Sequence, residues 1–173
     1  DDVENEIEAY IDNQCAGLKL ATGDDVGRVT YRTDGIKDYT DYLYESINGD
    51  LSGLNVCIDC ANGASAAVAR QLFPRLGAKC TFIGVEPDGK NINAGVGSTH
   101  LDKAVVEGGF DCGIAFDGDA DRCLACDEKG QEIDGDKVIA LLAKNMKEKG
   151  CLDGNTAVVT VMSNLGFIKF MES

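Results

Sequence analysis

The sequence predicts an α/β fold: a three-layer αβα domain with a mostly parallel, mixed sheet, flanked by remnants of neighbouring domains. The alternation of two sequence patterns supports this fold class. From residue 51 onwards, short apolar runs of strand length alternate with segments whose apolar residues recur every three or four positions. Strands and helices that alternate in this way favour parallel strands with helices on both faces of the sheet.

Three strands and two helices form the predicted core. In chain order they are a strand at residues 54–59, a helix at 65–76, a strand at 79–83, a helix at 101–107 and a strand at 112–116. The first of these helices follows an Asn62-Gly63 turn. Helix N-termini favour phosphate, but a single glycine is weak support for such a site, so we interpret this turn as an ordinary tight connection.

Further elements are expected on both sides of this core. In order they are a helix ending near Asn13, a connector at residues 15–38, a helix at 39–47, a hairpin at 123–133, a helix capped by Asp134 or Asp136, and a strand at 156–161. The last strand would begin a new structural unit.

Composition and charge limit the classes of function. The apolar fraction of 44% and the charged fraction of 27% are typical of a soluble globular protein, and no apolar run is long enough to span a membrane. The net charge of −14 argues against nucleic acid or an anionic membrane as a partner. The acidic start of the chain does not resemble a signal peptide, so we expect a cytoplasmic protein.

Eight cysteines invite a disulfide or zinc hypothesis. Two C-x-x-C pairs occur, Cys57 with Cys60 and Cys123 with Cys126, and each includes a predicted strand segment. Residues three apart in a strand point to opposite faces, so the two thiols of a pair should diverge. Buried, reduced cysteines in a cytoplasmic protein are therefore the favoured interpretation.

The most informative stretch lies between the predicted strands that end at Phe116 and begin near Cys123. Asp117, Asp119 and Asp121 occupy alternate positions, separated only by a glycine and an alanine, and Arg122 follows them. Small separators allow the three carboxylates to converge on one point. Hard oxygen ligands on a tight loop suit Mg²⁺ or Ca²⁺ better than a soft metal.

The acidic run has three alternative interpretations. An EF-hand loop would place glycine where Arg122 stands, and it needs flanking helices rather than strands. A carboxylate pair for glycoside hydrolysis fits three crowded acids and an arginine less well than an ion does. A solvated acidic turn without a ligand stays open.

Ser98 and His100 could suggest a nucleophile and its base. However, Thr99 and Asp102 form a capping box just before an apolar helix, and Ser98 is not in a nucleophile-elbow pattern. We therefore favour helix capping for this segment.

The acidic run at residues 117–122 resembles the metal-binding loop of the alpha-D-phosphohexomutase superfamily. The segments DCANGA at 59–64, NINAGVGSTH at 91–100 and IDGD at 133–136 resemble the same superfamily's second domain, in the same order. Together with TVMSNLG at 160–166, they most resemble the phosphoglucosamine mutases within it. The resemblance is good from about residue 51 to the C-terminus and loose before that.

This resemblance implies a mutase that moves phosphate between the 6- and 1-positions of a hexosamine phosphate, through an enzyme phosphoserine and a 1,6-bisphosphate. Asp117, Asp119 and Asp121 would bind Mg²⁺, and Arg122 would contact phosphate. A phosphomannomutase or phosphoglucomutase fragment and a non-catalytic cation-binding module are the alternatives.

The resemblance also implies a division of the chain into residues 1–50, the end of a first domain with its connector, residues 51–152, the domain with the metal loop, and residues 153–173, the start of a third domain. No phosphoserine motif of the family occurs in this sequence. We therefore expect missing domains of the same polypeptide as partners, and no mutase activity from this chain alone.

Overall fold

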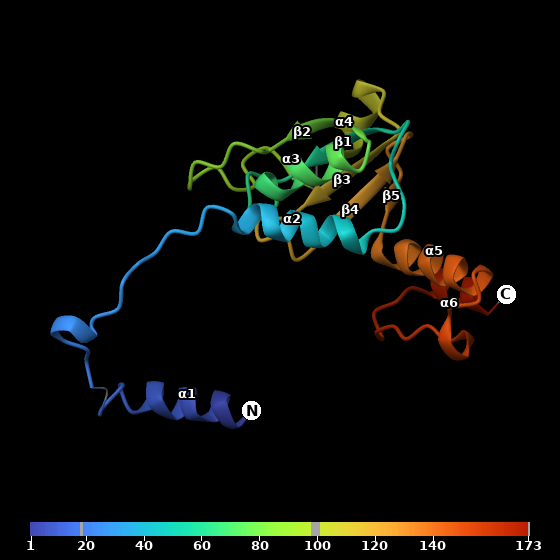
Figure 1. Cartoon of the computed structure of the whole chain (residues 1–173). Helices are drawn as coiled ribbons and strands as arrows, with labels where there is room; N and C mark the ends of the chain where they lie inside the picture. Colours follow the sequence, from blue (N-terminus) through green and yellow to red (C-terminus); the bar gives the residue numbers. More distant parts are fainter. Residues whose placement is uncertain (18, 98–100, 173) are drawn as a thin grey trace. The chain divides into compact units, whose positions relative to one another are not determined.

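The structure is a computed structural model that describes residues 1–17, 19–97 and 101–172. The chain forms two units, residues 1–33 and 34–173, which we describe separately. The first unit contains helix α1 (Asp2–Asp12) and a short 3₁₀ turn, η1 (Gly23–Asp25), in otherwise irregular chain (Figure 1). The expected N-terminal helix is confirmed, and every described residue of this unit is exposed. The connector is shorter than the predicted residues 15–38, because the helix expected at 39–47 begins four residues earlier, at Gly35.

The second unit contains the remaining elements. In order they are α2 (Gly35–Ser46), β1 (Asn55–Asp59), α3 (Ala66–Arg75), β2 (Lys79–Ile83), α4 (Leu101–Gly108), β3 (Cys112–Phe116), β4 (Cys123–Asp127), β5 (Glu132–Ile133), α5 (Gly135–Glu148), η2 (Asp153–Asn155) and α6 (Leu165–Met171). The predicted core strands and helices are therefore present, with bounds that differ by a residue or two at most.

The strands form one five-stranded sheet in the order β2-β1-β3-β4-β5. β1 runs parallel to both of its neighbours, because α3 and α4 provide crossover connections. β4 runs antiparallel to β3 and to β5, because tight turns join these strands. The α/β class is confirmed, and the sheet is mixed, with a parallel half around β1 and an antiparallel half around β4.

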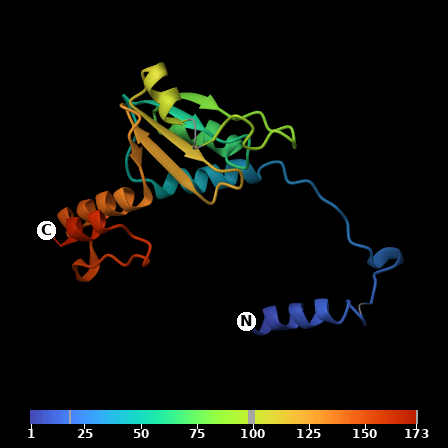
Figure 2. The same cartoon turned by 180° about the vertical axis from the view of Figure 1, so that it is seen from behind.

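Two apolar clusters, one on each face of the sheet, explain the three layers. Val56 and Ile58 of β1 pack with residues of α3, whereas Cys57 between them packs with Leu101 and Val105 of α4. This alternation is the two-residue period of a strand buried on both faces. In Figure 1 α2 and α3 lie in front of the sheet, and Figure 2 shows the strands from the other side.

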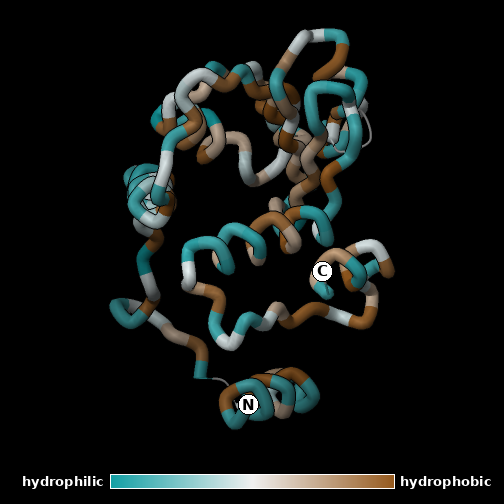
Figure 3. The backbone as a smooth tube through the Cα atoms, turned by 90° about the vertical axis from the view of Figure 1, so that its right-hand side faces the viewer, coloured by the Kyte–Doolittle hydropathy of each residue, from teal (hydrophilic) through white to brown (hydrophobic). Residues whose placement is uncertain are grey.

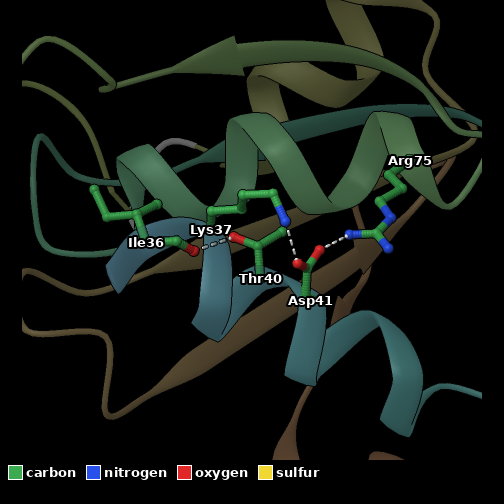
Figure 4. Close-up of polar contacts among 5 residues, drawn as sticks. All are labelled: Ile36, Lys37, Thr40, Asp41 and Arg75. Atoms are coloured by element: carbon green, nitrogen blue, oxygen red, sulfur yellow. Dashed lines mark hydrogen bonds and ion pairs between the residues drawn. The ribbon is translucent and has the colours of Figure 1, made fainter. Parts of the chain in front are cut away.

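Helix α2 packs against α3 and extends the layer on that face. Its Thr40 is 2% exposed and donates a hydrogen bond to the carbonyl oxygen of Ile36 at 2.8 Å. Asp41 forms ion pairs with Lys37 of the same helix and with Arg75 of α3 (Figure 4). The Asp41–Arg75 ion pair joins α2, which precedes the sheet in the chain, to α3 of the domain core.

The cysteines of the two C-x-x-C pairs follow the pattern expected of strand residues. The expected burial does not hold for all eight, because Cys15, Cys123 and Cys151 are exposed. Cys57 belongs to the apolar cluster on the α4 face and Cys60 to the one on the α3 face, so the two thiols diverge as predicted. Cys126 is buried and Cys123 is exposed. All eight cysteines are free thiols. Burial raises the pKa of the Cys57 thiol to about 11, with smaller contributions from Asp59 and Cys126, so this thiol is poorly reactive.

Helices α5 and α6 pack on each other at the C-terminal end of the chain. Asp134 caps α5, as one of the two expected alternatives, by accepting a hydrogen bond from the Lys137 amide at 2.8 Å. Asn164 caps α6 through the Phe167 amide, and its own amide donates to the Asp136 carboxylate at 2.7 Å. The acids of the IDGD segment therefore organise these two helices.

The prediction of a strand at residues 156–161 is wrong. This stretch is irregular, and Val158 and Val161 are 91% and 100% exposed. Apolar alternation alone does not form a strand, because the backbone groups also need a neighbouring strand to pair with. Figure 3 shows the hydrophobic character of the segment that leads to the C-terminus.

Among the helices that the structure describes, none is both long and apolar enough to cross a membrane. The capping box expected from Thr99, and the alternative pair of Ser98 and His100, lie outside the described residues.

Candidate metal site

The acidic run forms the connection between β3 and β4. Phe116 and Cys123 face each other as the last pair of that antiparallel ladder, so residues 117–122 form a tight loop at the strand ends. The Ala120 amide donates to the carbonyl oxygen of Asp117 at 3.2 Å, and Ala120 has a φ of +61°. The strand-to-strand loop predicted from the sequence is therefore present, and its flanking strands exclude an EF-hand.

The loop brings the three predicted carboxylates together. Asp117, Asp119 and Asp121 each offer one oxygen atom within 4.8 Å of the others. Asp117 is half-buried, and the other two are exposed. Three convergent hard oxygen ligands with free access from solvent can bind a small divalent cation that keeps several of its waters.

Arg122 folds back onto two of these acids. Its Nε donates to Asp117 at 2.7 Å and to Asp121 at 3.2 Å, and its backbone amide donates to Asp117 at 3.1 Å. Partial burial raises the pKa of Asp117, but the backbone and guanidinium of Arg122 more than offset this effect, so the net pKa is lowered. The positive guanidinium therefore neutralises part of the negative charge of the loop that would otherwise attract a cation.

The sequence motifs at 59–64 and 91–97 lie beside this loop. The Ala64 amide donates to the Gly118 carbonyl oxygen at 2.9 Å, and the Asn93 amide donates to the Ala61 carbonyl oxygen at 2.8 Å. β1, β2 and β3 are mutually parallel, and each of the three motifs follows the carboxyl end of one of them. Carboxyl ends of parallel strands share one sheet edge, which is where ligands bind in open α/β sheets.

Sequence reasoning missed one role in this arrangement. It took the Asn62-Gly63 turn as an ordinary tight connection, whereas the structure places the turn directly against the acidic loop. The parallel order of β1 and β3 was the signal that could have shown this contact.

Two hollows flank the acidic loop. One, of about 380 Å³, lies between α2, α3 and the loop, and it is mostly apolar. The other, of about 280 Å³, is lined by Ala115, Asp117, Arg122, Cys123 and Leu124. The carboxylates of the loop can therefore be reached from solvent without displacing a structural element.

Fold and site together define an α/β domain with a candidate divalent-cation loop at the carboxyl end of a central strand. Two family models match the chain, one after the other. The phosphoglucomutase/phosphomannomutase alpha/beta/alpha domain II matches residues 37–130, and domain III matches residues 134–173. The chain belongs to the phosphoglucomutase/phosphomannomutase family. The division of the chain into domains at residues 50/51 and 152/153, as expected from the sequence, stays a prediction.

Curated relatives agree with this assignment. A phosphoglucosamine mutase of Clostridium tetani is 51% identical over 175 residues, covering 99% of this chain and 39% of the relative. A phosphoglucosamine mutase of Bacillus mycoides is 47% identical over 176 residues, covering 100% of this chain and 39% of the relative. The chain thus spans about 39% of the length of the curated relatives it matches.

A solved structure supports the fold. A phosphoglucomutase/phosphomannomutase family protein from Burkholderia thailandensis aligns with a TM-score of 0.57 and 23% sequence identity. The alignment covers 66% of this chain and 26% of that protein.

Proposed function

We propose that this chain is the metal-loop part of a phosphoglucosamine mutase, which interconverts glucosamine 6-phosphate and glucosamine 1-phosphate. Relatives of that name match nearly the whole chain at 47% to 51% identity, and this observation supports the proposal most strongly. The convergence of three carboxylates on the loop of the matched domain II agrees with it.

Asp117, Asp119 and Asp121 would hold Mg²⁺ in this proposal. Their oxygens form the hard ligand set that Mg²⁺ prefers, and their exposure leaves room for waters and for a phosphate oxygen. When bound, the ion would offset the negative charge that spreads over the oxygens of a phosphoryl group in transfer.

Arg122 would contact phosphate. The guanidinium already lies at the loop, paired with Asp117 and Asp121, and its side chain is 82% exposed. A planar guanidinium donates to phosphate oxygens in the same way as to carboxylates. A cation that takes over the two carboxylates would free these donors for a phosphate group.

The phosphoryl donor in this proposal is a phosphoserine that lies outside this chain and forms a 1,6-bisphosphate with the sugar. The partners are accordingly a hexosamine phosphate and the remaining domains of the same polypeptide. We place the protein in the cytoplasm, where its eight free thiols would stay reduced.

A phosphomannomutase or phosphoglucomutase is the second candidate, because the matching family models have both names in their description. An assay of the full-length parent with glucosamine, mannose and glucose phosphates distinguishes the candidates. We expect turnover with glucosamine 6-phosphate to exceed the others by about two orders of magnitude in kcat/KM, as hydrogen-bonded substrate selection allows. Preference for mannose or glucose phosphate would overturn the assignment.

The same assay tests the loop. In the full-length parent, Asp119→Asn should lower kcat by about 100-fold or more, because the phosphoryl group in transfer loses charge stabilisation. Asp153→Asn removes the same charge at an exposed position in η2 and serves as the matched control. Equal activity of the two variants would contradict a catalytic role for the loop.

A further inference from the structure

Gly118, in the middle of the acidic loop, is packed on both sides. On one side lies Gly63, where an added Cβ would overlap the Gly118 carbonyl oxygen and lie 2.8 Å from its carbonyl carbon and Cα. On the other side lies Ile92, whose Cδ1 would be 2.5 Å from a Cβ added at Gly118. Neither glycine has a positive φ, so space and not backbone conformation requires glycine at position 63. At Gly118 the neighbouring atoms are the tip of the Ile92 side chain, which packs on the loop but can shift.

The Gly63 turn is itself held in shape by a buried carboxylate. Asp59, at the end of β1, is 2% exposed. Its two oxygens accept hydrogen bonds from the Ala61 amide at 2.8 Å and from the Gly97 amide at 2.6 Å. Ala61 and Asn62 both have a φ of +52°, a backbone conformation that L-residues rarely adopt and that needs such local support.

The two sides of Gly118 are also tied to each other. The Asn93 amide donates to the Ala61 carbonyl oxygen at 2.8 Å, and the Asn62 side-chain amide donates to the Asn91 carbonyl oxygen at 3.2 Å. The turn at 60–64 and the segment at 91–93 therefore form one connected support around the centre of the acidic loop.

We propose that Asp59, Gly63 and Ile92 are positioning residues that set the Mg²⁺ affinity of the acidic loop, although none of them offers it a ligand. Gly118 separates Asp117 from Asp119, so a shift of its backbone moves both carboxylates. Mg²⁺ demands near-ideal ligand geometry, and loss of groups that orient its ligands typically weakens binding 10- to 100-fold. This inference rests on the proposed metal site.

Titration calorimetry of the 173-residue chain with MgCl₂ alone tests the inference. Gly63→Ala should weaken Mg²⁺ binding about 10-fold, because the new methyl group displaces the Gly118 carbonyl. Gly35→Ala is the matched control, since a Cβ there meets nothing within 4 Å. We expect the control to bind as the wild type does.

Two further variants keep the test decisive if Gly63→Ala does not fold. Ile92 is 53% exposed, so Ile92→Ala should leave the thermal unfolding temperature without Mg²⁺ almost unchanged while weakening binding several-fold. Asp59→Asn replaces an acceptor oxygen with a donor facing a backbone amide, and it should weaken binding more. In the full-length parent, Ile92→Ala should raise the KM for Mg²⁺ and preserve kcat at saturating Mg²⁺.

Folded variants that bind Mg²⁺ like the wild type would overturn the positioning role. Failure of the metal site itself is a different outcome, because then the wild-type chain would show no Mg²⁺ binding, or Asp119→Asn would bind as well as the wild type.

Discussion

At the scale of single residues, the proposed metal site implies that Arg122 and a divalent cation would compete for the same carboxylate oxygens. The guanidinium donates to Asp117 and Asp121, and these contacts raise its own pKa, so it stays charged in all conditions of interest. A cation entering the loop must displace it. In the proposed site the arginine would therefore weaken metal binding to the resting loop and become available to phosphate when the ion is bound.

Arg122→Ala should therefore tighten Mg²⁺ binding by the isolated chain about 3- to 10-fold, because a competing positive charge is removed from the loop. The same variant should lower turnover of the full-length parent. Calorimetric titration measures the first effect and an enzymatic assay the second. Arg28→Ala, which removes an exposed arginine of the first unit, is the control. Weaker Mg²⁺ binding by Arg122→Ala would contradict the competition.

The sequence alone was enough to predict which carboxylates converge, because alternation with glycine and alanine is a local property of the loop. It was not enough to predict the role of Gly63. That role depends on the space between two loops that are far apart in the chain and meet only when β1 and β3 lie side by side. A local sequence pattern does not predict the contact between two loops that are far apart in the chain.

At the scale of elements, α2 is joined to α3 by a charged cluster as well as by the burial of Thr40 (Figure 4). The hydrogen bond from Lys37, and then that from Arg75, lowers the pKa of Asp41 below its ordinary value of 3.8. The Arg75 guanidinium also stacks on the Tyr44 ring, with its centre 3.9 Å from the ring centroid.

A pH effect follows from the lowered pKa of Asp41. A depressed carboxyl pKa stabilises the fold above the unfolded-state pKa, and this contribution is lost as the pH falls through the folded-state pKa. Asp41→Asn should therefore lower Tm by about 2 °C at pH 7 and have a smaller effect at a pH below the folded-state pKa. Thermal unfolding at both pH values checks this. Glu45→Gln, on the same helix, is the control, and a pH-independent effect of Asp41→Asn would contradict the account.

Most elements could be predicted because their apolar periodicity agrees with their final burial, as in β1 and β3. The strand at residues 156–161 could not, since its apolar pattern lacks a neighbouring strand with which to form a ladder. The hairpin expected at residues 123–133 is present as β4 and β5, and together with the antiparallel pairing of β3 and β4 it makes the sheet mixed, as predicted.

At the scale of the whole molecule, the chain corresponds to 39% of the length of its curated relatives. Phosphoryl transfer needs a phosphoryl donor, a metal, a base and a group that holds the second phosphate. This chain offers candidates for the metal ligands and for one phosphate contact. Precise positioning of donor and sugar contributes a large part of the rate in such reactions.

We therefore predict no detectable mutase turnover by the 173-residue chain, even with Mg²⁺ and the bisphosphate supplied. A coupled assay of glucosamine 6-phosphate conversion measures turnover, and intact mass analysis measures any stable phosphorylated form. The full-length parent is the positive control. Turnover that disappears in Ser98→Ala would show that this chain contains its own phosphoryl donor and would contradict the prediction.

The central claim is that Asp117, Asp119 and Asp121 bind Mg²⁺. The most direct measurement is an NMR titration of the ¹⁵N-labelled chain with MgCl₂, following the backbone amides of residues 117–122. We predict saturable shifts confined to this loop and its supporting segments in the wild type, and their loss in Asp119→Asn. Unchanged shifts in Asp119→Asn, or shifts centred elsewhere in the chain, would contradict the claim.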